Sequence, residues 1–349
     1  MKNVHGGDIY NNKVNMDFSV NINPLGIPNS VKQSMNEAIN KCECYPDIHC
    51  SELKSQVSKM LAENNCKVKQ DNILFGNGAS ELFMAIVHAI KPKNAVIPIP
   101  SFYGYDYALN AVDCNKNYCY IDLDKGLNTT QLINELSDDT DIIFIANPNN
   151  PTGQLLDLKE VTKILDYCFL KKIYVIIDEC FIDFCETAES AIKLINQYDN
   201  LIVVRAFTKI YAIPGVRLGY LVCGNNNLME KIEKNLPEWN ISVIAQSAGI
   251  ASTKEKKYLY ETKKYVSAQR KMLTEGLVNL GFKVFDSGAV FILFYSKKEL
   301  YKPLLKKGIL IRDCSNYKGL SEGFYRIAVK SEAENEKLLK AIGECIEDY

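Results

Sequence analysis

Five apolar runs rich in β-branched residues recur along the first two-thirds of the chain. Each run is continuous rather than alternating, which is typical of strands in a sheet covered on both faces. Segments with helical spacing, residues 80–91 and 157–171, separate some of these runs. A series of strands and helices of this kind predicts a mostly parallel α/β sheet. The expected strands are residues 94–100, 141–148, 173–179, 200–207 and 217–223.

The pattern changes after about residue 225. A long charged, helix-favouring region (226–280) leads into three short apolar runs and a terminal amphipathic helix. This order predicts a smaller α+β domain. We therefore expect an N-terminal arm over residues 1–30 that is associated with the small domain and the active-site mouth. A large domain would follow over residues 31–250 and the small domain over 251–349.

Composition narrows the class of protein. The 349 residues are too many for one ordinary core, which agrees with two domains. The formal net charge of −1 gives no overall field that would favour nucleic acid or an anionic membrane. The first fifteen residues lack an apolar signal core, and no window reaches the length of a membrane span. We expect a cytoplasmic protein.

The twelve cysteines are scattered and form no CxxC pair. Reduced thiols are a better interpretation than disulfides. One cluster combines metal-ligand types, but its spacing fits no common zinc pattern, so we expect no metal site there. Its members are Cys42, Cys44, His49 and Cys50.

Polar side chains follow three consecutive predicted strands. An amide-rich segment, NPNNPTG (147–153), comes after the first, Asp178 after the second, and Lys209 after the third. Ligands of open α/β sheets bind at the carboxyl ends of the strands. The sequence therefore predicts that an amide, a carboxylate and a lysine meet at one edge of the sheet.

A glycine-rich turn before the predicted helix at 80–91 adds an anion site. The start of a helix presents free N–H groups that suit phosphate, although a plain Ser-capped helix explains this turn equally well. Cations and hydroxyls further along the chain complete a phosphate cup. Its predicted members are Gly78, Ala79, Ser80, Thr208 and Arg217.

This set of groups matches the requirements of pyridoxal 5'-phosphate. Lys209 would form a Schiff base with the aldehyde, and burial together with Arg217 would lower the pKa of its amine. Asp178 would pair with the pyridine nitrogen and keep it protonated. Asn150 would donate to the phenolic oxygen, and Phe102 would stack on the ring.

The chain resembles the class I and II aminotransferases, a family of fold-type I pyridoxal-phosphate enzymes. The motifs that carry the resemblance are YPD (45–47), GNGASE, NPNNPTG, DECFIDF, FTKIYAIPGVRLGY and RIAV (326–329). The resemblance implies a seven-stranded sheet, and it gives Lys209, Asp178, Asn150 and Arg217 the roles described above. It also implies a homodimer in which Tyr45 reaches the neighbouring subunit's cofactor. Arg326 would bind the α-carboxylate of the substrate.

Two positions depart from the wider family pattern. Ala206 stands where a hydroxyl residue often contacts the cofactor phosphate. Phe181 stands where a tyrosine often bonds the phenolic oxygen. We expect one phosphate contact fewer, and a Schiff base that is easier to protonate.

Within the family, three segments resemble the L-threonine-O-3-phosphate decarboxylases of cobalamin biosynthesis: HGGDIY with DFSVNINPLGIP, DECFIDF, and LIRDCSNYKGL. The resemblance implies decarboxylation of L-threonine O-3-phosphate to (R)-1-aminopropan-2-yl phosphate. Such a substrate needs one site for carboxylate and one for phosphate. Arg326 and Arg312 are available for these anions, with His5 and Asn23 supplied by the N-terminal arm.

Two alternatives remain. Histidinol-phosphate aminotransferases are the next relatives, and transamination would follow if the Cα–H bond, rather than the Cα–carboxylate bond, stood perpendicular to the cofactor ring. A non-catalytic cofactor-binding module is a weaker alternative, because Lys209 and its partners are all present. A nucleotide site is disfavoured, because the sequence has neither GxGxxG nor GxxxxGK[ST].

Overall fold

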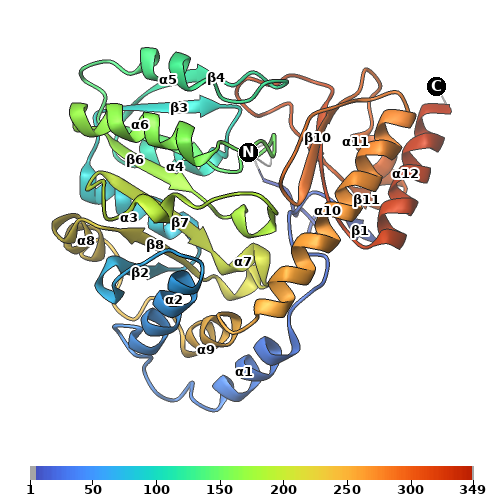
Figure 1. The fold of residues 1–349 in the computed structure, drawn as a ribbon. Coiled ribbons are helices and arrows are strands. Elements are labelled where there is room, and N and C mark those ends of the chain that lie inside the picture. The colour runs from blue at the N-terminus through green and yellow to red at the C-terminus, as the bar shows by residue number, and fades with distance from the viewer. Residues whose placement is uncertain (1–4, 348–349) are drawn as a thin grey trace.

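A seven-stranded, mostly parallel sheet forms the centre of the structure, a computed structural model that describes residues 5–347 (Figure 1). In this sheet β8 is antiparallel to both of its neighbours, and the strands from β7 to β4 are mutually parallel. The predicted α/β fold class is confirmed. In spatial order the strands are β2 (Ile73–Gly76), β8 (Gly219–Cys223), β7 (Leu201–Ala206), β6 (Tyr174–Asp178), β5 (Ile142–Ala146), β3 (Asn94–Ile99) and β4 (Asn115–Tyr120).

Helices cover both faces of this sheet, which explains why its inner strands are continuously apolar. Neighbouring residues of one strand, such as Ile142 and Ile143, belong to separate apolar clusters on opposite faces. One face is covered by α3 (Ala79–Ile90), α4 (Tyr103–Asn110) and α8 (Asn226–Glu233). The other is covered by α2 (Ser51–Glu63), α6 (Leu158–Lys171) and α9 (Val243–Ser252), with α1 (Asn29–Ile39) on α9 and α5 (Thr129–Glu135) on α6.

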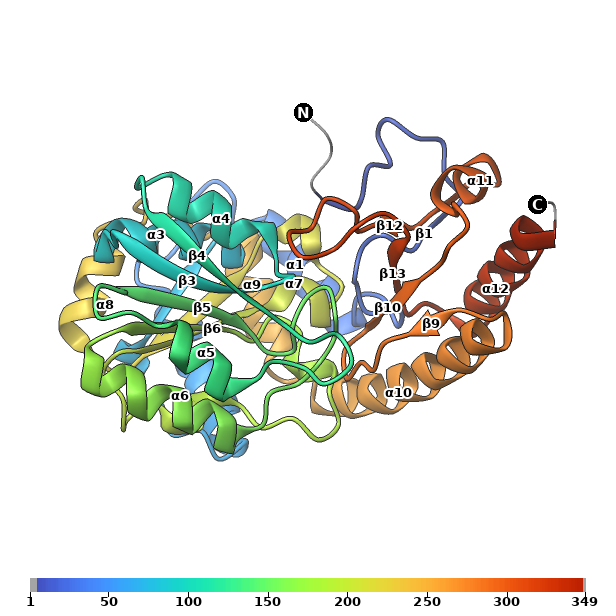
Figure 2. The ribbon, with the colours of Figure 1, turned by 90° about the horizontal axis from the view of Figure 1, so that it is seen from above.

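A second, four-stranded antiparallel sheet lies beside the first (Figure 2). The long helix α10 (Lys256–Asn279) runs from the large sheet to this small one and packs against α12 (Glu332–Glu347). In spatial order the strands are β12 (Arg312–Asp313), β13 (Phe324–Ala328), β10 (Phe291–Tyr295) and β9 (Lys283–Val284), and α11 (Tyr301–Lys306) precedes β11 (Ile309–Leu310).

The N-terminal segment is attached to this second sheet. Strand β1 (Met16–Asp17) pairs in parallel with β11, and the Ala328 N–H donates to the Phe18 carbonyl at 2.8 Å. The sequence likewise predicts an N-terminal arm that is associated with the small C-terminal domain. The domain boundaries at residues 30 and 250 stay predictions, and residues 1–4 and 348–349 lie outside the described residues. Within residues 5–347, no helix is long and apolar enough to cross a membrane.

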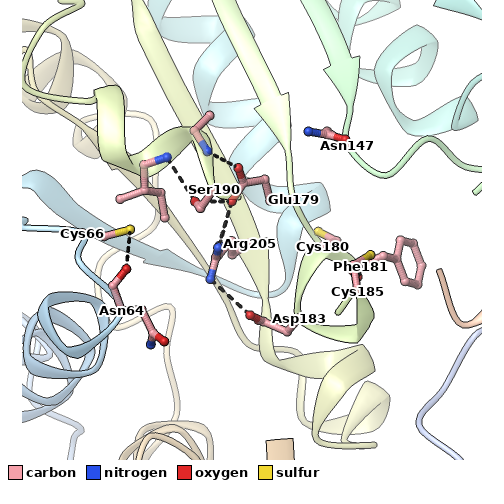
Figure 3. A network of polar contacts seen from close by, with 12 residues as sticks. Asn64, Cys66, Asn147, Glu179, Cys180, Phe181, Asp183, Cys185, Ser190 and Arg205 are labelled. Atoms are coloured by element: carbon pink, nitrogen blue, oxygen red, sulfur yellow. Dashed lines mark hydrogen bonds and ion pairs between the residues drawn. The ribbon is translucent and has the colours of Figure 1, made fainter. Parts of the chain in front are cut away.

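A buried ion pair joins the carboxyl ends of β6 and β7 (Figure 3). Both Nε and Nη2 of Arg205 lie about 3 Å from Oε2 of Glu179, at 3.0 and 2.9 Å. The same carboxylate accepts from the Ser190 hydroxyl and the Ala191 N–H, each at 2.6 Å. Asp183 lies 3.4 Å from Nη1 of the guanidinium. The Glu179 carboxylate is fully buried, so its four contacts, two from Arg205 and one each from Ser190 and Ala191, must replace its hydration.

We expect the substitution Glu179→Gln to lower the free energy of unfolding by about 3–5 kcal/mol, because it leaves the Arg205 cation buried without its main partner. Urea denaturation followed by circular dichroism measures this change. Lys256→Ala, which breaks an exposed pair with Glu63, is the control and should leave the unfolding midpoint unchanged. Equal midpoints for the two variants would contradict a structural role for the buried pair.

Candidate functional site

One cavity of about 310 Å³ lies at the carboxyl ends of β5, β6 and β7. Asn150 follows β5, Asp178 ends β6, and Lys209 lies in the short helix α7 (Phe207–Ile210) directly after β7. All three side chains line the cavity. Parallel strands that end at one edge bring these groups together, which is the convergence that the sequence predicts.

Asp178 is held by two donors on one side of the cavity. Its Oδ2 accepts from the Tyr105 hydroxyl at 2.6 Å, and its Oδ1 accepts from the Cys180 N–H at 3.0 Å. Burial raises the pKa of the carboxyl, and the hydrogen bonds from Cys180 and Tyr105 oppose that rise. A carboxylate in this setting is suited to a protonated ring nitrogen as its further partner.

Tyr105 is a site residue that sequence reasoning missed. It lies in the first turn of α4, three residues after Phe102, and packs between Phe83 and Phe144 with ring centroids 5.2 and 5.1 Å away. Burial raises the pKa of its phenol well above the usual value, so the hydroxyl stays protonated and donates. The aromatic run SFYGYDY signals a packed site, but spacing alone does not show which tyrosine faces Asp178.

Lys209 combines the properties of a reactive amine. Burial lowers its pKa, and the nearby Arg217 and Arg326 cations add to that effect, although Cys180 and Asp178 oppose it. The lowered pKa follows the prediction made from the sequence. An amine with a lowered pKa is unprotonated in a larger fraction of molecules, and only the unprotonated amine can attack an aldehyde or accept a proton.

Four residues of the predicted phosphate cup line the same cavity, namely Ala79, Ser80, Thr208 and Arg217. Gly78, with φ +77°, is the N-cap residue of α3, and this helix start has no side-chain cap, which leaves first-turn N–H groups available near Ala79 and Ser80. The Arg217 side chain lies against the turn before α3, where its Nη2 donates to the Asn77 carbonyl at 3.2 Å. A Cβ on Gly78 would lie 2.5 Å from Nη2 of Arg217, which explains why glycine is needed here.

Other predicted residues line this cavity as well. Thr208 is buried beside Lys209, and Phe102 forms an edge contact with Tyr105 at 5.7 Å. Ala206 also lines the cavity, so its methyl group occupies the place where the family pattern has a hydroxyl. Phe181 faces the cavity and packs on Phe291 with ring centroids 5.1 Å apart.

Arg326 enters the cavity from β13 of the small sheet. Its Nη2 donates to the Ser19 carbonyl at 2.9 Å, and its Nη1 donates to the Asn150 side-chain oxygen and, at 3.3 Å, to the Tyr317 hydroxyl oxygen. Its buried Nε has no hydrogen-bond partner among the described residues. Because the Asn150 oxygen is occupied, the Asn150 amide nitrogen is the group left to donate to a ligand.

A second cavity of about 300 Å³ adjoins the first, and the two share His5, Gly6 and Ser19. Arg312 of β12 lines it and donates to the Asp313 carbonyl at 2.6 Å and to Oδ1 of Asn316 at 2.8 Å. Burial, Arg312 and Lys209 together lower the pKa of His5. The His5 ring lies 5.9 Å from the Phe102 ring, so the N-terminal arm reaches the cavity mouth.

Two predicted residues lie elsewhere. Asn23 lines neither cavity. Its amide donates instead to the Ile210 carbonyl and the Thr262 hydroxyl, each at 2.8 Å. The predicted place of Asn23 in the substrate site is therefore wrong. Asn21 lines the first cavity instead, and its buried Oδ1 has no partner among residues 5–347. Tyr45 is 82% exposed and packs at a tilt against Trp239, and it does not line the cavity of its own chain.

The fold and the cavity define an α/β protein with a buried lysine of lowered pKa, a buried aspartate and a glycine-capped helix start beside one another. The family model of aminotransferase class I and II matches residues 13–342, and the chain belongs to this family. The threonine-phosphate decarboxylase of Salmonella typhimurium is 33% identical over 332 residues, which cover 94% of this chain and 90% of that protein.

Solved structures agree with this assignment. The histidinol-phosphate aminotransferase from Clostridium acetobutylicum matches with a TM-score of 0.89 and 33% identity, over 96% of this chain and 100% of that one. A histidinol-phosphate aminotransferase from Sinorhizobium meliloti in complex with pyridoxal-5'-phosphate has the same fold, with a TM-score of 0.88 and 20% identity, over 98% and 93% of the two chains. The predicted family resemblance is confirmed.

Proposed function

We propose that the protein is a pyridoxal-phosphate-dependent decarboxylase of L-threonine O-3-phosphate. The observation that carries this proposal is the pair of adjoining cavities, each with a buried arginine, next to the lysine of lowered pKa. Arg326 suits a carboxylate, and Arg312 suits a second anion such as phosphate. Histidinol phosphate carries only one anionic group, so it would not use both arginines at once, whereas a phosphorylated amino acid would.

The residues of the first cavity fit pyridoxal phosphate. Gly78, Ala79, Ser80, Thr208 and Arg217 would hold its phosphate, Asp178 its ring nitrogen and Asn150 its phenolic oxygen. Phe102 would lie on the ring. Lys209 would anchor this cofactor, which when bound would supply a ring able to withdraw electrons from the substrate's Cα.

The chain's own residues then have distinct tasks. Arg326 holds the leaving carboxylate, while Arg312 and His5 hold the phosphate of the substrate. When the Cα–carboxylate bond breaks, the carboxylate leaves as carbon dioxide. A proton must then bind Cα in its place. Lys209 would deliver that proton to Cα. Its lowered pKa lets the amine give up a proton more readily than an exposed lysine does.

Incubation of the purified holoenzyme with L-threonine O-3-phosphate tests the reaction. We expect release of carbon dioxide and formation of aminopropanol phosphate, measured by a coupled carbon dioxide assay and by ³¹P NMR. Lys209→Ala should lower the rate on the order of 10³-fold, because it removes the covalent anchor and the proton donor. A product that forms only when 2-oxoglutarate is present would replace this proposal with transamination.

The substitution Gly78→Ala tests the phosphate cup. The new methyl group would be strained at a positive φ and would displace Arg217, so we expect the dissociation constant for pyridoxal phosphate to rise by about tenfold or more. Absorption titration of the apoprotein with pyridoxal phosphate measures it. Gly215→Ala is the matched control, because a Cβ there meets no atom within 4 Å. Equal affinities for the two variants would place the phosphate elsewhere.

We also propose that the protein forms a homodimer and that Tyr45 acts in the neighbouring subunit's site. In support of this, Tyr45 and the half-exposed Trp239 form an aromatic patch, with ring centroids 5.1 Å apart. A cavity of about 400 Å³ lined by Ile48, Pro237 and Trp239 lies beside them. Exposed apolar groups gathered in this way are typical of contact surfaces.

Hybrid dimers test this arrangement. A Tyr45→Ala chain refolded with an equal amount of a Lys209→Ala chain should recover about one quarter of the wild-type activity, because half of the dimers are hybrids with one complete site each. Either variant alone should stay below that value. Sedimentation velocity checks that both variants remain dimeric. A mixture that is no more active than the sum of its components would contradict the shared site.

A further inference from the structure

We propose that Tyr317 sets the spacing between Arg312 and Arg326, and so makes the site select substrates that carry a carboxylate and a second anion together. Tyr317 is a positioning residue in this proposal, because it acts through the two arginines. The inference rests on the proposed function only in that each arginine binds one anionic group. It does not depend on which bond to Cα is broken.

The two arginines are direct neighbours across the small sheet. Arg312 of β12 and Arg326 of β13 are Cα partners in an antiparallel ladder. Directly opposite residues present their side chains on the same face of a sheet, and like charges in these positions destabilise it. Both arginines are also buried, so water screens their repulsion little. This costly arrangement indicates a site built to hold two anions at a fixed separation.

Tyr317 contacts both of these cations. Its hydroxyl oxygen accepts from Nη1 of Arg326 at 3.3 Å. The guanidinium carbon of Arg312 lies 5.1 Å from the centroid of the same tyrosine ring. The negative face of an aromatic ring attracts a guanidinium at this distance. One side chain thus uses its oxygen for the first arginine and its ring for the second.

The loop that carries Tyr317 is fixed at both of its sides. On the small sheet, Tyr317 packs against the apolar cluster that includes Phe285 and Leu293. On the large sheet, Lys318 pairs with Asp106 at 2.9 Å and lies 3.9 Å from the Tyr118 ring centroid. The tyrosine is therefore held in place by neighbours other than the arginines, and its contacts add to those that Asn150 and Ser19 make with Arg326 and that Asn316 makes with Arg312.

The division of the cavities agrees with this role. Tyr317 and Arg326 line the cavity that contains Lys209, whereas Arg312, Ser315 and Asn316 line the adjoining one. Tyr317 therefore lines the first cavity and contacts, through its ring, an arginine of the second. A substrate that reaches both arginines needs a short chain between its two anionic groups.

Three probes without an amino group test the proposal on the holoenzyme, because they cannot react with the cofactor. They are 3-phosphoglycerate, which carries both anions, glycerate, which carries only the carboxylate, and glycerol phosphate, which carries only the phosphate. Dissociation constants are measured by calorimetry for the wild type, Tyr317→Phe and Tyr317→Leu. Tyr295→Phe is the matched control, because Tyr295 packs in the same cluster without lining either cavity.

We expect Tyr317→Phe to weaken glycerate and 3-phosphoglycerate equally, by about tenfold, because only the hydrogen bond to Arg326 is lost. Glycerol phosphate should bind this variant as it binds the wild type. Tyr317→Leu also removes the ring, so glycerol phosphate should weaken by about fivefold and the preference for 3-phosphoglycerate over glycerate should fall.

Two results would overturn the proposal. One is wild-type affinity for all three probes in both variants. The other is an equal loss for all three probes in both variants together with a lower melting temperature, which would mean that Tyr317 only supports the fold. A wild-type protein that binds 3-phosphoglycerate no better than glycerate would instead contradict the two-anion site. A failed decarboxylation assay leaves all of these binding results interpretable.

Discussion

The buried ion pair between Glu179 and Arg205 fixes the relation between the two strands on which the site depends. Asp178 and Glu179 are neighbours in the chain, and successive residues of a strand point to opposite faces of the sheet. Glu179 therefore turns to Arg205 on one face, while Asp178 faces Tyr105 and the cavity on the other. Arg205 belongs to β7, which leads directly into the helix that carries Lys209. A pair that joins the ends of β6 and β7 holds the aspartate and the lysine at one separation.

Sequence periodicity predicted the inner strands and the groups at their ends, because a strand covered on both faces needs an uninterrupted apolar run. Sequence periodicity missed β4, whose residues NKNYCY include only one that is buried, Cys119. This strand pairs only with β3 within the described sheet, so it has an open edge and no need for continuous apolar residues. The sequence also missed β2, which has four residues and gives too short a pattern.

The site was predicted well where a side chain follows a strand, and less well where it depends on tertiary packing. Asn21 and Asn23 are two residues apart in the same extended segment, and periodicity does not distinguish their partners. The Thr262 hydroxyl of α10 and the Ile210 carbonyl of α7 bind the second asparagine and leave the first in the cavity. The sequence did not indicate Tyr105 and Tyr317 either, because their hydrogen-bond partners are set by tertiary packing. Tyr105 bonds Asp178, 73 residues away, and Tyr317 bonds Arg326, 9 residues away.

Arg326 and Asn150 link the two halves of the site. Asn150 follows a strand of the large sheet, and Arg326 belongs to the small one, yet the arginine donates to the asparagine oxygen. That bond orients the Asn150 amide so that its nitrogen is left for a ligand, and it orients the guanidinium for an anion. The group that would contact the cofactor and the group that would hold the substrate carboxylate are therefore set by one another. A cavity built in this way is complete only when both sheets are in place. This explains why α10, the N-terminal arm and the loop of Lys318 all connect the two sheets around it.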